Sequence, residues 1–147
     1  MTIPRFARGK FAIKNKEKYV GTRTPTYRSG WEHAFMRLCD EHPNVHKWAS
    51  ESIRIPYRHP LTGKYTIYVP DFFIVYMDKE GRKHAELVEV KPKSQTTLEN
   101  AGRSHAKKKQ VVINTAKWEA ANAYAKQNRM RFRVVSEDQL FYNGKRK

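Results

Sequence analysis

The sequence has little of several features that would define a protein of its size. It contains a single cysteine, Cys39, so no disulfide can form within the chain. Its six histidines are scattered and show no spacing typical of a zinc site. No apolar run is long enough to cross a bilayer, and no amphipathic helix combines a basic face with a bulky apolar one. These absences argue against a disulfide-rich, zinc-binding or membrane-bound protein.

The first nineteen residues also lack an apolar segment of signal-peptide length. Together with the lone cysteine, this favours a reducing, cytoplasmic compartment. We therefore expect a protein that works in the cytoplasm of the cell in which it is made.

Acidic residues are scarce. The chain has 14 Asp and Glu against 30 Lys and Arg, a formal net charge of +16 and a pI of about 10.1. This excess is larger than solubility requires and indicates a polyanionic partner, most simply nucleic acid. Hydrophobic residues at 39% and aromatic residues at 12% nevertheless argue for a folded protein, and 147 residues suit one domain.

The N-terminal segment, residues 1–28, is predicted to be a basic arm. Prolines and glycines interrupt any regular element in it, and its aromatic residues favour packing against the rest of the protein. One acidic residue, Glu17, stands among its basic residues, which are Arg5, Arg8, Lys10, Lys14, Lys16, Lys18, Arg23 and Arg28. Residues 29–147 are then expected to form a single domain.

Hydrophobic periodicity in that domain predicts helices on the faces of a sheet. Helical spacing over 29–42, with Ser29 as N-cap, predicts an amphipathic helix that carries Glu32 in its first turn. Period-two patterns predict strands at 52–57 and 84–91 and, at 65–76, one long strand or two joined at Pro70. The 65–76 run is apolar on both faces, as in a central strand.

The C-terminal half is predicted to continue with a basic loop and one more helix and strand. Residues 92–112 are expected to be a mobile loop or a partly helical flap. A helix capped by Asn114 or Thr115, a strand at 130–135 and a short helix at 136–140 should follow. The order of elements indicates an α/β fold, with a mixed central sheet flanked by helices.

The residues that suggest chemistry lie on two strands joined by one hairpin. Asp71 follows Pro70, which marks a strand start or a bulge, and Glu89 lies two residues before Lys91. Alternation places Glu89 and Lys91 on one face of their strand and Val88, Val90 and Glu86 on the other. Glu86 is therefore not expected in the site.

Asp71 and Glu89 can be cross-strand neighbours. Two carboxylates in a partly dry place repel each other unless a cation lies between them, and Mg²⁺ is the natural choice. Lys91 would then lie at the edge of the metal site, where its ammonium could hold a water or offset charge on a phosphate. The competing interpretation, a turn cap at Asp71 and a surface Glu89–Lys91 pair, is worth at most about 1 kcal/mol and leaves the basic charge unexplained.

These residues resemble the motif of a known nuclease superfamily. Glu32, Pro70-Asp71 and Glu89-Val90-Lys91 are similar, in order and in context, to the PD-(D/E)xK motif of the restriction-endonuclease-like nucleases. The segment YRSGWE resembles the helix-start glutamate motif of phage Holliday-junction resolvases and of the cutting subunit of heteromeric transposases. The run from GKF at 9–11 to VVSEDQL resembles the head-completion nucleases of contractile-tailed phages.

The resemblance implies a restriction-endonuclease-like core and an Mg²⁺-dependent endonuclease, with Mn²⁺ able to substitute. It implies metal ligation by Asp71, Glu89 and the Val90 carbonyl, a further metal or water contact from Glu32, and a role for Lys91 in assisting the attacking water. It also implies a role in phage head completion and DNA packaging, in the host cytoplasm or with the virion, with head or neck proteins as partners. Two alternatives stay open, a junction resolvase or repair nuclease and a non-catalytic DNA-binding virion protein.

DNA contacts are expected at basic residues around this site, namely Arg28, Lys93, Lys107, Lys108 and Lys109. No recognition helix or base-reading motif is apparent, so cutting should be structure-selective or nonspecific. With one site per chain, double-strand cutting would need a homodimer or two successive nicks.

Overall fold

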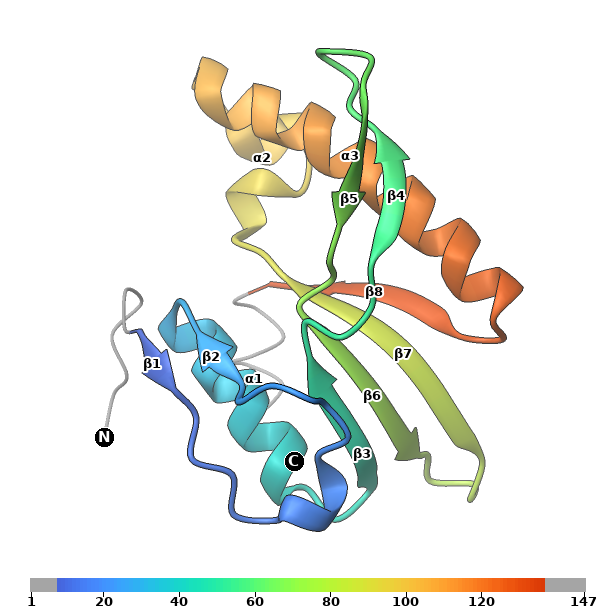
Figure 1. Cartoon of the computed structure of the whole chain (residues 1–147). Coiled ribbons are helices and arrows are strands. Elements are labelled where there is room, and N and C mark those ends of the chain that lie inside the picture. The colour runs from blue at the N-terminus through green and yellow to red at the C-terminus, as the bar shows by residue number, and fades with distance from the viewer. Residues whose placement is uncertain (1–7, 137–147) are drawn as a thin grey trace.

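The computed structural model describes residues 8–136 and is shown in Figure 1. Its strands are β1 (Gly9–Lys10), β2 (Thr26–Tyr27), β3 (Val45–Ser50), β4 (Ile55–Arg58), β5 (Tyr65–Tyr68), β6 (Phe72–Met77), β7 (Lys83–Val90) and β8 (Arg131–Val135). Its helices are α1 (Gly30–Glu41), α2 (Leu98–Ala101) and α3 (His105–Gln127), with short 3₁₀ turns η1 (Lys16–Lys18) and η2 (Lys93–Gln95).

The central sheet has four strands in the order β3-β6-β7-β8. β6 pairs antiparallel with both β3 and β7, whereas β7 and β8 run parallel. Parallel neighbours need a long crossover, and here α3 supplies it. Helix α1 lies on one face of this sheet, and α3 with the β4–β5 hairpin lies on the other (Figure 1). The mixed sheet flanked by helices that the sequence predicts is confirmed.

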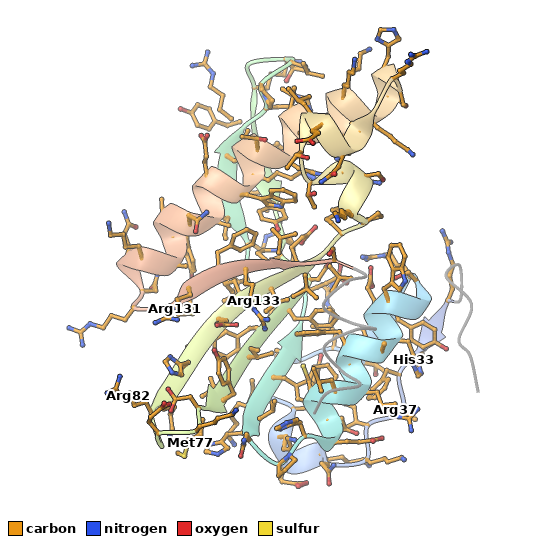
Figure 2. The ribbon with its side chains drawn as sticks, turned by 180° about the vertical axis from the view of Figure 1, so that it is seen from behind. His33, Arg37, Met77, Arg82, Arg131 and Arg133 are labelled. Atoms are coloured by element: carbon orange, nitrogen blue, oxygen red, sulfur yellow. The ribbon has the colours of Figure 1, made fainter. Side chains whose placement is uncertain are left out.

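Helix α1 forms because its cap and its apolar stripe agree. The Ser29 hydroxyl accepts the amide of Glu32 at 3.1 Å, as the N-cap prediction requires. Phe35, Met36 and Cys39 are buried and belong to the core that α1 forms with Phe72, Val88 and other apolar residues of the sheet. Figure 2 shows His33 and Arg37 on the side of α1 turned away from the sheet.

The opposite face of the sheet packs against small residues of α3. Ala121 and Ala125 are buried with Leu87 and with Tyr57 and Tyr68 of the hairpin. Alanines let the helix approach the sheet closely, so that side chains from β5 and α3 meet next to the end of β7.

The described part of the N-terminal segment packs against α1 and β3. Phe11 is buried against the ring of Trp48, and the backbone amides of Lys14 and Asn15 donate to the carboxylate of the fully buried Asp40. These hydrogen bonds satisfy both oxygens of a buried carboxylate and attach the segment to the end of α1.

Some predicted element bounds hold and others are wrong. The 65–76 run is two strands that meet at Pro70, as one of the two predicted alternatives has it, and β5 and β6 belong to different sheets because Pro70 cannot donate to the ladder. The strand expected at 52–57 begins only at Ile55, as β4, and β3 at Val45–Ser50 was not predicted. Glu51, whose φ is +49°, ends β3 and turns the chain away from the central sheet. The predicted helix at 136–140 lies, from residue 137 onward, outside the part of the chain that the structure describes.

The basic loop predicted at 92–112 is also shorter than expected. Helix α3 begins at His105, where the Ser104 hydroxyl accepts the amide of Lys107 at 3.2 Å. Its first turns are mostly exposed and basic, so they carry little of the apolar periodicity on which the prediction depended. Within residues 8–136, no helix has the length and apolar content of a bilayer-spanning segment.

Candidate active site

The candidate site lies where β6 begins and β7 ends. Pairing of Phe72 with Val88 places the preceding residue, Asp71, beside Glu89 on the neighbouring strand. The chain enters this point from the β4–β5 hairpin and leaves it through η2 towards α3 (Figure 1). Two strands of the sheet, the hairpin and α3 therefore converge here.

The carboxylates of Asp71 and Glu89 each accept a hydrogen bond from a backbone amide at or next to the other residue. The Asp71 amide donates to Glu89 Oε1 at 3.3 Å, and the amide of Val90 donates to Asp71 Oδ2 at 2.8 Å. Glu89 is 5% exposed. The structure thus brings together the two carboxylates that the sequence singles out, with their orientations fixed.

Burial sets the electrostatics of this pair. It raises the pKa of Asp71 well above its usual range, and the nearby charges of Glu89 and Glu32 raise it further. Burial also raises the pKa of Glu89, although Lys91 and the hydrogen bond from Tyr68 oppose that rise. Both carboxylates therefore resist ionising together until a cation shares the site.

Lys91 lies on the Glu89 side of the strand, as alternation predicts. Its Nζ is 3.6 Å from Glu89 Oε2, and its backbone amide donates to the Val135 carbonyl at 3.0 Å. The bond to Val135 continues the β7–β8 ladder past Val90 and so fixes the direction in which the lysine leaves the sheet.

Glu32 reaches this region from the first turn of α1. Its Oε1 accepts the amide of Arg28, the residue before the Ser29 N-cap, at 3.1 Å, while its own amide donates to the Ser29 hydroxyl at 3.1 Å. Burial raises the pKa of Glu32, and Glu89 contributes to that rise. Among residues 8–136, however, no three acidic, histidine or cysteine side chains converge closely enough to ligate one ion.

The donor set still fits a hard divalent cation. No hydrogen bond within the described chain occupies Asp71 Oδ1, and Glu89 Oε2 has only the Lys91 ion pair. Two carboxylate oxygens on adjacent strands, with the Val90 carbonyl between Glu89 and Lys91, are the oxygen ligands that Mg²⁺ and Mn²⁺ prefer. Water would complete the coordination of such an ion.

The predicted DNA contacts divide into two groups. Arg28 is paired with Glu51, Nη1 to Oε2 at 2.7 Å, and the Glu51 amide donates to the Asp71 carbonyl at 2.9 Å. This pair ties the N-terminal segment to the site. Lys93 lies in η2 directly after the site, whereas Lys107, Lys108 and Lys109 lie on the first turns of α3 rather than in a loop.

Two residues of this site were missed from the sequence. Tyr68 donates its hydroxyl to Glu89 Oε1 at 2.7 Å, and burial beside that carboxylate raises the tyrosine pKa. Lys117 of α3 places its Nζ 5.6 Å from the centre of the Tyr68 ring. The sequence held a signal for Lys117, because this lysine lies four and eight residues before Ala121 and Ala125 and so falls on the apolar stripe of the helix.

Asn114 fixes the segment that follows the site. It is fully buried, its Nδ2 donates to the Gln95 carbonyl at 3.2 Å, and its Oδ1 accepts from Gln110 at 2.9 Å. The chain after Lys91 is thereby attached to α3, one helical turn before Lys117.

Two comparisons with known proteins show the family of this chain. Residues 42–137 match the family model described as TnsA-like endonuclease N terminal, a span that includes Asp71, Glu89, Lys91 and Lys117. The chain is also 34% identical over 142 residues to the head completion nuclease of Enterobacteria phage T4, covering 90% of this chain and 92% of that protein. The predicted kinship with restriction-endonuclease-like nucleases is confirmed: the chain belongs to the TnsA-like N-terminal endonuclease family.

Proposed function

We propose that this protein is a divalent-metal-dependent DNA endonuclease that hydrolyses phosphodiester bonds during completion of the phage head. One observation carries the proposal: Asp71 and Glu89 lie together under mutual backbone hydrogen bonds, with the Lys91 ammonium 3.6 Å from Glu89. Its relative from phage T4 is a head completion nuclease, which supports the biological role.

Each residue has a defined task in the proposed reaction. Asp71, Glu89 and the Val90 carbonyl would hold the metal, and Glu32 of α1 would add a further metal or water contact. Lys91 would position the attacking water and offset the charge that grows on the phosphate oxygens. When bound, Mg²⁺ or Mn²⁺ would supply a more acidic water and polarise a phosphoryl oxygen.

DNA would be drawn to the site by the net charge of +16 and held through its phosphates. Arg28, Lys93, Lys107, Lys108 and Lys109 are the proposed contacts, and the sequence has no apparent recognition helix or base-reading motif. Cutting should therefore be nonspecific in sequence or selective for DNA structure. Double-strand cutting would need a second copy of the chain or two successive nicks.

The proposal favours head completion over its two rivals. A junction resolvase would use the same chemistry, and would be recognised by a strong preference for four-way junctions over plain duplex. A non-catalytic virion protein would have no need for a buried, mutually oriented carboxylate pair, since burying such a pair costs stability. We propose action in the host cytoplasm or with the virion, alongside head or neck proteins.

A nuclease assay tests the proposed function. Purified protein is incubated with supercoiled plasmid, linear duplex and a four-way junction, in Mg²⁺, in Mn²⁺ and in excess chelator. We expect cleavage with either metal and none with chelator. The proposal fails if all three DNAs remain intact with both metals while the protein is folded and binds DNA.

A further inference from the structure

Lys117 lies where its helix should carry an apolar residue. On α3 it falls between Asn114, one turn earlier, and Ala121, one turn later, and both neighbours are fully buried. Lys117 itself is partly buried. Removing an ammonium from water is costly, so an aliphatic side chain would pack more stably in this position.

The ammonium points at the residue that orients Glu89. Its Nζ lies 5.6 Å from the centre of the Tyr68 ring, and the hydroxyl of that ring donates to Glu89 Oε1 at 2.7 Å. Within the described chain, Lys117 makes no hydrogen bond or ion pair, so its three N–H donors have no protein acceptor. A cation held on an aromatic face keeps its position and leaves its donors available to a ligand.

The charged groups that act on Lys117 are those of the candidate site. Burial lowers the pKa of Lys117, the positive charge of Lys91 lowers it further, and Glu89 and Asp71 raise it. Lys117 on α3 is therefore within electrostatic reach of the carboxylate pair that Lys91 contacts from β7. A metal bound to these carboxylates would neutralise them and leave both lysines without counter-charge.

We propose that Lys117 is a second phosphate-binding lysine of the active site, which contacts a non-bridging oxygen of the DNA backbone from the α3 side. This inference rests on the proposed function and deepens it. Lys91 would face the phosphate from the sheet and Lys117 from the helix, so that the backbone passes between β7 and α3. Charge-assisted hydrogen bonds from two directions restrict how a phosphate can lie in the site.

Salt dependence of DNA binding tests the contact directly. Labelled duplex is titrated with protein at several salt concentrations in the Glu89→Gln background, in which the DNA should not be consumed. Each lost phosphate contact on duplex lowers the slope of log affinity against log salt by about 0.9. Lys117→Met should lower the slope by about one, whereas Lys117→Arg, which keeps a cation, should preserve most of it.

Lys79 supplies a matched control. It is an exposed lysine in the β6–β7 turn, at the end of the sheet away from the site, so Lys79→Met removes the same charge elsewhere. We expect Lys79→Met to leave the slope unchanged. An unchanged slope for Lys117→Met, or equal losses for both variants, would overturn the inference.

Single-turnover cleavage separates substrate contact from support of Glu89. With otherwise wild-type protein, Lys117→Met should slow cleavage at saturating DNA at least tenfold, and Lys117→Arg should restore part of the rate. If Lys117 acts only through Tyr68, then Tyr68→Phe and Lys117→Met would have the same rate loss and neither would change the salt slope. If wild-type protein does not cleave DNA, the proposed function fails but the inference about Lys117 does not, because the salt dependence of binding is measured without cleavage.

Discussion

Asp71 and Glu89 are joined by a reciprocal arrangement in which each carboxylate accepts a backbone amide at or beside the other residue. The Asp71 amide bonds Glu89, and the amide of Val90, the residue after Glu89, bonds Asp71. Neither carboxylate can turn away without breaking a hydrogen bond. The pair is therefore oriented before any cation arrives, as a preorganised site requires.

Stability should rise when the buried Asp71 charge is removed. The folded-state pKa of Asp71 is raised, so the folded protein keeps this proton to a higher pH than the unfolded chain, whose aspartates titrate near about 3.9. Stability therefore falls as pH rises from about 4 through the folded pKa, and the loss is complete above it. Without metal at pH 7, Asp71→Asn should unfold at a higher temperature than wild type, and the difference should shrink towards pH 4.

Asp78 provides a control of opposite sign for that measurement. Its pKa is lowered by the hydrogen bond with His84 and by turn amides, so its charge supports the fold above the unfolded pKa and this support is lost as pH falls. Asp78→Asn should therefore destabilise at pH 7. Our electrostatic account is contradicted if Asp71→Asn proves less stable than wild type at both ends of the pH range.

Divalent metal should stabilise the wild-type protein. A ligand that binds only the folded state stabilises it by about 2.7 kcal/mol at a concentration one hundred times its dissociation constant. Titration calorimetry and thermal unfolding with Mg²⁺ and Mn²⁺ should both detect this effect, and Asp71→Asn should lose it. Equal thermal shifts for wild type and Asp71→Asn would show that the metal binds elsewhere.

Removing the Tyr68 hydroxyl should impair the site more than the fold. Tyr68→Phe deletes the 2.7 Å hydrogen bond to Glu89 while the ring stays in the α3 core. Losing a group that orients a metal ligand costs roughly 10–100-fold in metal affinity or activity, and a buried hydrogen bond about 1 kcal/mol of stability. Metal titration and cleavage rates check the first value and denaturant unfolding the second. Unchanged metal affinity and rate would mean that the hydroxyl is dispensable to the site.

Substitutions of Arg28 and of its partner Glu51 should have opposite effects on DNA binding. If Arg28 contacts phosphate as proposed, it must exchange its 2.7 Å bond with Glu51 for the DNA. Arg28→Gln should then weaken duplex binding, and Glu51→Gln should strengthen it by releasing the arginine. Because the pair is partly exposed, either change should cost less than about 1 kcal/mol of stability. Equal weakening by both variants would indicate that the pair acts only on the structure of the site.

Local patterns predicted the parts of the site that depend on strand geometry. Period-two alternation assigns Glu89 and Lys91 to one face and Glu86 to the other, and the structure places Glu86 there, with its Oε1 3.0 Å from Arg133 Nε. Pro70 marks a strand start because it lacks an amide donor, and the break falls at that residue. These features follow from the chain itself, whatever packs around it.

The parts of the site that come from other elements depend on tertiary packing, which local patterns do not show. Lys117 lies 26 positions after Lys91 in sequence and reaches the site only because α3 crosses from β7 to β8 over that face of the sheet. Tyr68 belongs to a hairpin outside the central sheet, so alternation along β6 could not place it. The start of α3 was missed because its exposed basic turns have no buried stripe until Val111.

The central claim is that Glu89 serves a metal-dependent reaction, and the same strand offers its own control. Glu86 is a second buried glutamate, three residues away and on the opposite face of the sheet. Glu89→Gln and Glu86→Gln should be compared with wild type on supercoiled DNA in Mg²⁺, with thermal unfolding to confirm that both variants fold. We predict that Glu89→Gln loses cleavage at least a hundredfold while folded Glu86→Gln keeps it. Cleavage by Glu89→Gln at the wild-type rate would contradict the account.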